Sequence, residues 1–190
     1  MTRSNNAVNQ LENARIAVRA GDQIRADAMY AGILEVDPQS FEALTHLGQR
    51  AYAAGRLEAA IDLLGRAYRV RTNDSNACKN LGAAFRAAGH KEMAIDLLRE
   101  AVRLDPESFV ARLLYGAACE DSGRTHDALS AFYGALSTAQ RLGRWLNDAT
   151  TAPMLRPLVA HAIRTVDAGR TRLFDSSLAP LRERFGSAAL

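Results

Sequence analysis

Histidines, cysteines and carboxylates are the side chains from which a catalytic or metal-binding site would be built. None of the four histidines begins a His-x-Asp sequence; they are His46, His90, His126 and His161. A non-haem iron site needs two histidines and a carboxylate around an open metal position. The sequence also has no nucleotide-binding glycine loop, serine-hydrolase elbow or His-Glu-x-x-His motif. We therefore expect scattered surface or boundary histidines, no metal, no cofactor and no enzymatic activity.

The two cysteines, Cys78 and Cys119, form neither a Cys-x-x-Cys pair nor a disulfide framework. Free cysteines of this kind are most often small buried apolar residues. The N-terminus, MTRSNNAVNQ, lacks the apolar core of a secretory signal. No apolar run approaches the ~18 residues that would span a membrane. These observations predict a cytoplasmic protein without a membrane partner.

The net charge of +3 does not indicate a basic surface along the chain. Lys and Arg number 24 against 21 Asp and Glu, and the excess lies within residues 143–190. Aromatic and basic residues do not alternate on one helical face, as they do where single-stranded nucleic acid binds. An apolar fraction of 48% is typical of a globular protein. We therefore expect no nucleic-acid partner.

The elements that would position any site repeat with a fixed period. Four glycines follow one another at 34-residue intervals: Gly21, Gly55, Gly89 and Gly123. Seven residues before the last three of them stand Leu47-Gly48, Leu81-Gly82 and Tyr115-Gly116. A small residue after a large one allows two helices to approach closely, and a glycine past a helix accepts a left-handed backbone. The pattern predicts helix pairs joined by glycine turns.

This pattern resembles the tetratricopeptide repeat, a helix–turn–helix unit of 34 residues. The third copy carries most of the family's pattern, in Cys78, Leu81, Gly82, Phe85, Ala94, Leu98, Ala101 and Pro106. The resemblance implies an all-α fold, a right-handed solenoid of about four repeats with C-terminal capping helices. The repeats are expected at about 7–40, 41–74, 75–108 and 109–142. Residues 1–142 would then form the array, and residues 143–190 a helical cap or connector.

The resemblance also implies a non-catalytic module that binds a protein or peptide in the groove lined by the first helices. The family's groove positions that carry polar or basic side chains here are Arg15, Arg19, Gln49, Tyr52, Asn76, Lys79, Asn80 and Arg86. Amide side chains there would hydrogen-bond a peptide backbone, and Lys79 and Arg86 would hold a carboxylate. The alternative is that these residues are simply solvated helix positions. The sequence does not decide between the two interpretations.

Residues 143–190 resemble the connector that precedes the oxygenase domain in bacterial proteins of the aspartyl/asparaginyl β-hydroxylase type. This resemblance implies a second function: the substrate-presenting N-terminal region of a larger Fe(II)- and 2-oxoglutarate-dependent enzyme. Independently, the segment has an apolar helical stripe formed by Leu155, Leu158, Val159, Ile163 and Val166. We expect this stripe to cover the fourth repeat, and a chain cut at residue 142 to self-associate through its uncovered C-terminal end.

Overall fold

The computed structural model describes residues 2–142, 161 and 164–165, and this part of the chain is all helical. It forms two compact units, residues 1–89 and residues 90–190. The first contains α1 (Thr2–Arg19), α2 (Gln23–Val36), α3 (Phe41–Ala53), α4 (Leu57–Val70) and α5 (Ser75–Ala87). The second contains α6 (Lys91–Leu104), α7 (Phe109–Asp121) and α8 (Thr125–Leu142). Among these helices none is long and apolar enough to cross a membrane.

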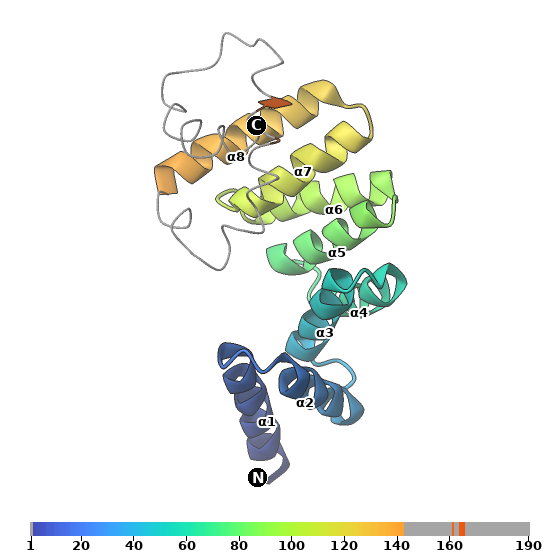
Figure 1. Ribbon diagram of the computed structural model, residues 1–190, viewed down its shortest axis with the longest axis vertical. Helices are drawn as coiled ribbons and strands as arrows, with labels where there is room; N and C mark the ends of the chain where they lie inside the picture. The colour runs from blue at the N-terminus through green and yellow to red at the C-terminus, as the bar shows by residue number, and fades with distance from the viewer. Residues whose placement is uncertain (1, 143–160, 162–163, 166–190) are drawn as a thin grey trace. The chain divides into compact units, whose positions relative to one another are not determined.

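In the first unit each helix packs against the next one along the chain. The contacts run from α1 to α2, to α3, to α4 and to α5, and α3 also reaches α5 (Figure 1). Hydrogen bonds between Arg15 on α1 and Glu42 on α3 show that α3 also contacts α1, so α3 borders both other first helices of this unit. Ala14, Tyr30 and Ala43, from three successive helices, are buried in one cluster. This arrangement places the side chains of α1 and α3 within reach of each other.

The glycine turns have the backbone that the sequence predicts. Gly21, Gly55, Gly89 and Gly123 all adopt positive φ, between 70° and 82°. At the second turn the N–H of Arg56 donates to the carbonyl of Ala51, and the N–H of Gly55 donates to the carbonyl of Tyr52. This pair of bonds is the Schellman motif, which satisfies the last carbonyls of a helix. The prediction of a left-handed glycine after each first helix is confirmed.

The glycines inside the first helices mark close approaches between helices. A Cβ on Gly48 would lie 2.7 Å from Cγ of Leu64, and a Cβ on Gly116 would lie 2.6 Å from Cδ1 of Phe132. Leu64 and Phe132 belong to the buried core. Only a residue without a side chain fits these positions, as the repeat pattern predicts. Gly82, the third residue of this type, is also buried in its helix.

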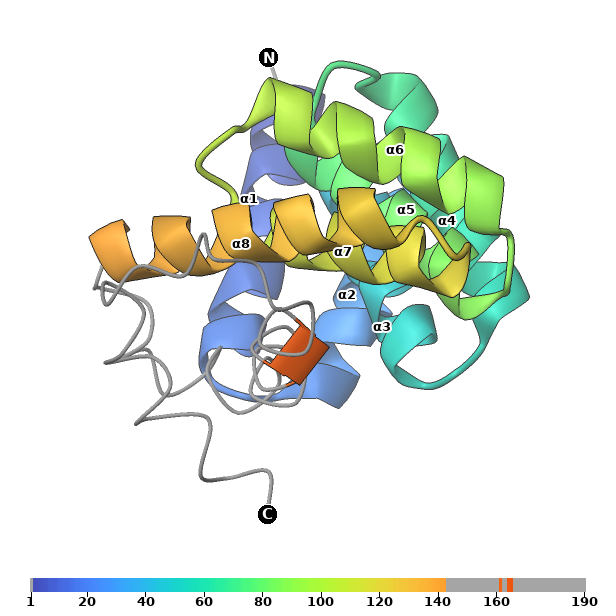
Figure 2. The ribbon, with the colours of Figure 1, turned by 90° about the horizontal axis from the view of Figure 1, so that it is seen from above.

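The second unit has α7 between α6 and α8, and α8 runs along α7 (Figures 1 and 2). Cys119 on α7 is buried and unoxidised, as is Cys78 in the first unit. Burial raises the pKa of the Cys119 thiol above its usual value. Both cysteines therefore act as small core residues, as predicted.

Within the second unit, two described residues beyond Leu142 contact α7 and α8. Nε2 of His161 lies 2.5 Å from Oε2 of Glu120 on α7, and the His161 ring meets the edge of the Phe132 ring at 6.0 Å. The hydroxyl of Thr165 donates to Oε1 of Glu120 at 3.4 Å. A segment capping the fourth repeat would make contacts of this kind. The apolar stripe itself, from Leu155 to Val166, lies outside the described residues, so the cap stays a prediction.

Candidate functional site

The predicted groove residues all belong to the first unit. Arg15 and Arg19 lie on α1, Gln49 and Tyr52 on α3, and the remaining four on α5. All eight side chains are exposed or half-buried. Since α3 contacts both α1 and α5, the eight residues lie on consecutive first helices. The structure thus places the predicted residues in one unit but does not gather all of them into one cavity.

A cavity of about 510 Å³ lies between α1 and α3. Three of the predicted residues line it, namely Arg15, Arg19 and Gln49. Its other walls come from the neighbouring helices and from the end of α4: Val18, Tyr30, Phe41, Glu42, Thr45, His46 and Arg71. Tyr52 and the α5 residues lie outside this cavity. The site therefore has a hollow between α1 and α3 and a separate polar surface on α5.

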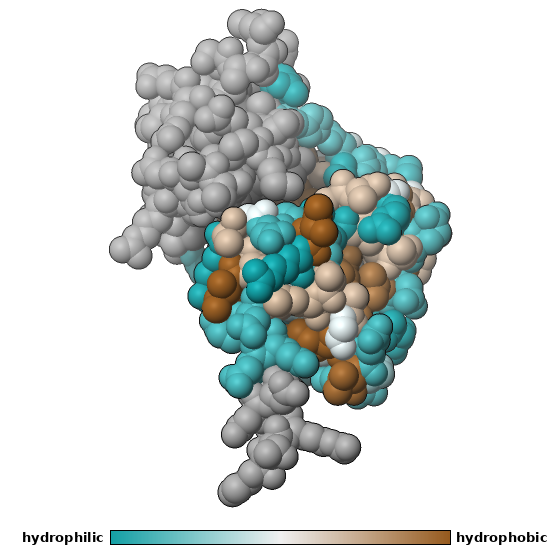
Figure 3. All heavy atoms as spheres, turned by 60° about the horizontal axis from the view of Figure 1, so that its bottom comes forward, coloured by the Kyte–Doolittle hydropathy of each residue, from teal (hydrophilic) through white to brown (hydrophobic). Residues whose placement is uncertain are grey.

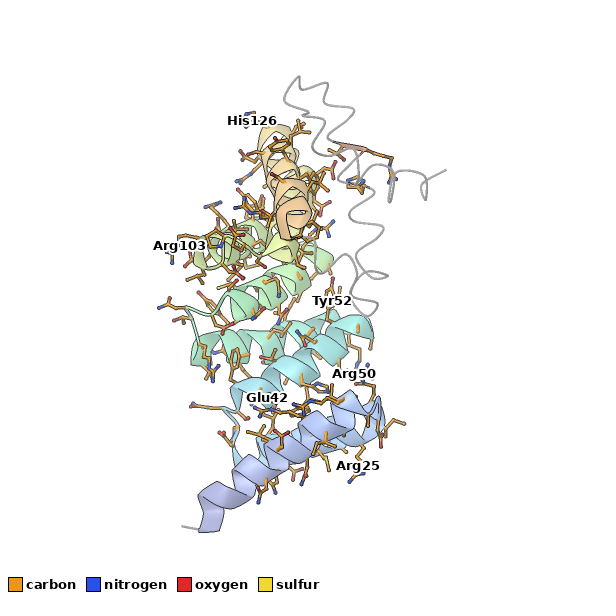
Figure 4. All side chains as sticks on the ribbon, turned by 90° about the vertical axis from the view of Figure 1, so that its left-hand side faces the viewer. Arg25, Glu42, Arg50, Tyr52, Arg103 and His126 are labelled. Atoms are coloured by element: carbon orange, nitrogen blue, oxygen red, sulfur yellow. The ribbon has the colours of Figure 1, made fainter. Side chains whose placement is uncertain are left out.

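Glu42 is the only carboxylate that the described residues contribute to the cavity wall, and its oxygens are already engaged. Nε and Nη2 of Arg15 donate to Oε1 and Oε2 of Glu42 at 2.8 Å and 2.5 Å, and the Tyr30 hydroxyl donates to Oε1 at 2.9 Å. The Arg15 hydrogen bonds hold the pKa of Glu42 below its usual value despite burial. Burial and the neighbouring carboxylate raise the pKa of Tyr30 to about 12. Glu42 thus joins α1, α2 and α3 (Figure 4).

A second polar cluster joins α2 to α3 behind the cavity. Nε2 of His46 lies 2.9 Å from Oδ1 of Asp27, and Nε of Arg50 donates to Oδ2 of Asp27 at 3.1 Å. The His46 ring lies 4.3 Å from the Tyr30 ring, centroid to centroid. Burial raises the pKa of Asp27, but the two hydrogen bonds outweigh it and hold this pKa below its usual value. The contacts with Asp27 and Tyr30 hold the ring of His46, which lines the cavity, in place.

Two guanidinium groups at the cavity, those of Arg19 and Arg71, can donate hydrogen bonds to a ligand. The Arg19 side chain is 71% exposed, and its ion pair with Glu12 is long, at 3.5 Å. Cζ of Arg71 stands 4.2 Å from the centroid of the Phe41 ring, which holds it by a cation–π contact. An exposed guanidinium can bind a carboxylate through two parallel hydrogen bonds. The cavity can therefore accept an anionic group beside an apolar surface.

The surface of α5 is polar and basic. Nζ of Lys79 donates to Oδ1 of Asn76 at 2.6 Å, one turn away on the same helix. Asn80 and Arg86 are half-buried on this helix. The amide groups offer both donors and acceptors, which suits the backbone of an extended peptide. This surface continues the groove positions of α1 and α3 along the first unit.

The sequence analysis missed part of this site. It treated His46 as a scattered surface or boundary histidine, whereas the side chain is only 15% exposed and packs on Tyr30. It gave no role to Arg71 and only the repeat's packing role to Tyr30, which is equivalent to Leu64 and Leu98. Spacing alone cannot show which polar partners these residues meet. Among the described residues, no group of three or more His, Cys, Asp or Glu side chains could hold a metal ion.

Family comparisons agree with the repeat pattern. Two models of the tetratricopeptide repeat match the sequence, one over residues 11–77 and one over residues 75–108. Together they span more than half of the chain. No curated protein sequence matches it. Neither model reaches residues 143–190, so the hydroxylase-type connector has no support from these comparisons.

Solved structures show the same fold. A crystal structure of MamA protein aligns with a TM-score of 0.66 at 21% identity, covering 97% of this chain and 96% of that chain. YrrB, described as a TPR protein with an unusual peptide-binding site, aligns with a TM-score of 0.62 at 20% identity, covering 94% of this chain and 92% of its own. An O-GlcNAc transferase of Thermobaculum terrenum aligns with a TM-score of 0.65 at 26% identity. The alignment covers 74% of this chain but only 27% of the transferase. The chain belongs to the tetratricopeptide repeat family.

Proposed function

We propose that this chain is a non-catalytic protein-interaction module that binds an extended, acidic peptide along α1, α3 and α5. The observation that carries the proposal is the cavity between α1 and α3, which Arg19 and Arg71 line. The carboxylate in its wall, Glu42, already accepts hydrogen bonds from Arg15 and Tyr30. The first helices are the surface that this family uses for peptides. YrrB, a structure of the same fold, is described as having a peptide-binding site.

Charge favours an acidic ligand over a basic one. The predicted groove residues Arg19, Lys79 and Arg86 are basic, and the groove positions of the first unit also include the acidic Glu42. Glu42, in the cavity wall, is neutralised by Arg15. A groove of one sign attracts segments of the opposite sign and disfavours like-charged ones. Exposed contacts of this kind act mainly on association and specificity, and salt weakens them.

The polar amides give the groove a second means of recognition. Gln49 lies at the cavity, and Asn76 and Asn80 lie on α5. Amide side chains bond to peptide N–H and C=O groups of any sequence. In the proposed complex the amides hold the peptide backbone while the basic side chains of the groove select its acidic residues. A carboxylate would contact Arg19 and Arg71 at the cavity.

The hydroxylase interpretation is the second hypothesis for this chain. It assigns the groove to the polypeptide substrate of a catalytic domain that would follow residue 190. No contact in the described residues favours it. The sequence of the parent gene tests it directly: an open frame that continues into a domain with His-x-Asp and a later histidine supports this hypothesis, and a stop codon near residue 190 removes it.

The proposed ligand class is tested by displaying a random peptide library to the full chain. Selected peptides are expected to be enriched in Asp and Glu, and their affinity is expected to fall as salt is raised, because exposed charges are screened. A scrambled lysine-rich peptide of equal length is the control and should not bind. Selection of peptides without acidic enrichment, or with salt-independent affinity, would contradict the proposal.

A further inference from the structure

A second cavity of the first unit, here called the α4 cavity, lies where the end of α4 meets the turn between α2 and α3. Its volume is about 440 Å³. Sites that bind small organic molecules have volumes of roughly 300–1,000 Å³. None of its described lining residues lines the cavity between α1 and α3. They are Pro38, Gln39, Leu44, Arg66, Arg69 and Val70.

The first of its two arginines is held in place by the backbone. Nη2 of Arg66 donates to the carbonyl of Pro38 at 2.9 Å, and the Arg66 side chain is only 35% exposed. Nη1 of Arg66 lies 3.8 Å from Oδ2 of Asp62, and a long pair with an exposed carboxylate contributes little. The guanidinium of Arg66 is therefore positioned, and it still has N–H donors for a ligand.

The second arginine, Arg69, stands one turn further along α4 and is exposed. It forms no ion pair within the part of the chain that the structure describes. Residues three apart are neighbours on a helix surface, and Arg66 and Arg69 line the same cavity. Asp37 and Asp62, which neighbour the lining residues, do not line it themselves. The described lining therefore carries two positive charges and no negative one.

The equivalent positions of the other repeats lack this pair of arginines. In the third repeat they are Glu100 and Arg103, and Nε and Nη2 of Arg103 donate to the carboxylate of Glu100 at 2.7 Å and 2.6 Å. In the first repeat they are Gly32 and Glu35, and the fourth has no arginine at either position. The second repeat thus has two like charges where the third has an ion pair. Like charges one turn apart disfavour their helix, and an anion bound between them would offset this repulsion.

The rest of the cavity wall is largely apolar. Leu44 is fully buried, whereas Pro38 and Val70 are exposed beside the arginines. Apolar residues beside hydrophilic ones are also seen on the face of the first unit that α1 and α2 form (Figure 3). A ligand that fits both parts of the α4 cavity wall has an anionic group and an apolar body.

We propose that the α4 cavity binds a small organic phosphate monoester. Such a group carries about two negative charges at neutral pH, which matches the two arginines, whereas a carboxylate carries one. The fork of N–H donors on a guanidinium fits phosphate oxygens. The organic part of the ligand would contact Leu44 and Val70. This site is separate from the peptide groove and does not rest on the function proposed for the groove.

Titration of the full chain with phenyl phosphate, followed by nuclear magnetic resonance of the backbone amides, tests this proposal. Saturable shifts are expected at Gln39, Leu44 and Val70. Phenyl sulfate has a similar shape with a single negative charge, and inorganic phosphate lacks the apolar body. Both are expected to bind about tenfold more weakly than phenyl phosphate. Absence of saturable shifts at these residues, or equal affinity for phenyl phosphate and either control, would overturn the proposal.

Two arginine substitutions test where the phosphate binds. Arg69→Ala removes a side chain without an ion pair, so it should keep the melting temperature while raising the dissociation constant of phenyl phosphate about tenfold. Arg56→Ala removes an exposed positive charge at the opposite end of α4 and should change it little. An acidic peptide selected for the groove should bind Arg69→Ala as it binds the wild type, so the two proposals can fail separately. Equal effects of the two substitutions on phenyl phosphate would show that the α4 cavity is not the site.

Discussion

At the residue scale, Glu42 is the side chain on which the candidate site depends most. It accepts hydrogen bonds from Arg15 on α1 and Tyr30 on α2 while belonging to α3 itself. Arg15, which the sequence analysis proposed as a ligand-binding residue, therefore also positions the helix that faces it. Its exposed edge still lines the cavity. Arg15 thus both lines the cavity and holds α3 through Glu42. Residue type alone cannot distinguish residues that bind a ligand from residues that stabilise the site.

Glu42→Gln is predicted to lower the free energy of unfolding by about 1 kcal/mol at pH 7, because charge-assisted hydrogen bonds are replaced by weaker ones. The folded-state pKa of Glu42 lies below its unfolded value. Its contribution is therefore complete above the unfolded pKa of about 4.3, and is lost as pH falls through the folded pKa. Urea unfolding of both proteins at several pH values measures this.

Glu12→Gln is the control for that experiment. Glu12 also pairs with Arg15, at 3.2 Å, but it is exposed and belongs to the same helix. Exposed pairs of this kind contribute little to stability. If Glu42→Gln destabilises the chain no more than Glu12→Gln does, or if its effect is the same at pH 7 and in acid, Glu42 does not have the role described here.

Long-range polar pairs were the part of the site that could not be predicted. His46 meets Tyr30 and Asp27, which are 16 and 19 residues away along the chain. Tyr30 stands at the packing position of Leu64 and Leu98, but the repeat pattern does not specify its polar partners, and His46 and Asp27 stand where the repeat requires no given residue type. A periodic pattern specifies which residues pack, but individual polar contacts depend on side-chain length and on the offset between neighbouring repeats. The groove positions of Arg15, Arg19 and Gln49 were predictable because the family uses those positions.

At the element scale, helix pairs are held by close approach at glycine. Gly48→Ala is predicted to destabilise the chain by about 1–3 kcal/mol. Alanine favours a helix over glycine by about 1 kcal/mol. The new Cβ would nevertheless lie 2.7 Å from Cγ of Leu64 and 3.3 Å from its backbone N, so the two helices must separate. Thermal unfolding followed by circular dichroism measures the change.

Gly65→Ala is the matched control, on the helix that contains Leu64. A Cβ there would meet only Nη1 of Arg69, at 3.9 Å. The helix-propensity gain should then appear alone, and the variant should be more stable than the wild type by about 0.5–1 kcal/mol. Gly48→Ala is therefore expected to lower the stability of the chain and Gly65→Ala to raise it. A stabilised Gly48→Ala would show that α3 and α4 do not approach as closely as described.

The helices and their turns could be predicted because the repeat presents the same evidence several times. One Leu-Gly pair is weak evidence, but two such pairs and Tyr115-Gly116, in register with four glycines, fix the phase of every helix. The repeat pattern describes the buried positions of each helix and says nothing of its exposed side.

At the scale of the whole molecule, His161 and Thr165, beyond Leu142, contact α7 and α8 of the second unit, to which they belong. His161→Ala is predicted to lower the stability of this unit by about 1 kcal/mol, because it removes the hydrogen bond to Glu120 and the edge contact with Phe132. His126→Ala is the control, since the His126 side chain is 98% exposed. Equal melting temperatures for the two variants would argue against a cap at this position.

The central claim is that an acidic peptide binds along the first helices of the first unit. Arg19→Glu with Lys79→Glu reverses two groove charges, on α1 and α5. Arg56→Glu with Arg69→Glu reverses two exposed charges of the same unit, at the start of α4 and on its outer side. Both pairs change the net charge equally. Any difference between them therefore reports the location of the ligand.

The most direct measurement is the dissociation constant of one selected acidic peptide for the wild type and for these two double variants, by fluorescence anisotropy at a single salt concentration. Our account predicts at least a tenfold loss of affinity for Arg19→Glu with Lys79→Glu, and little change for Arg56→Glu with Arg69→Glu. Equal losses for both double variants, or no loss for the groove variant, would contradict it.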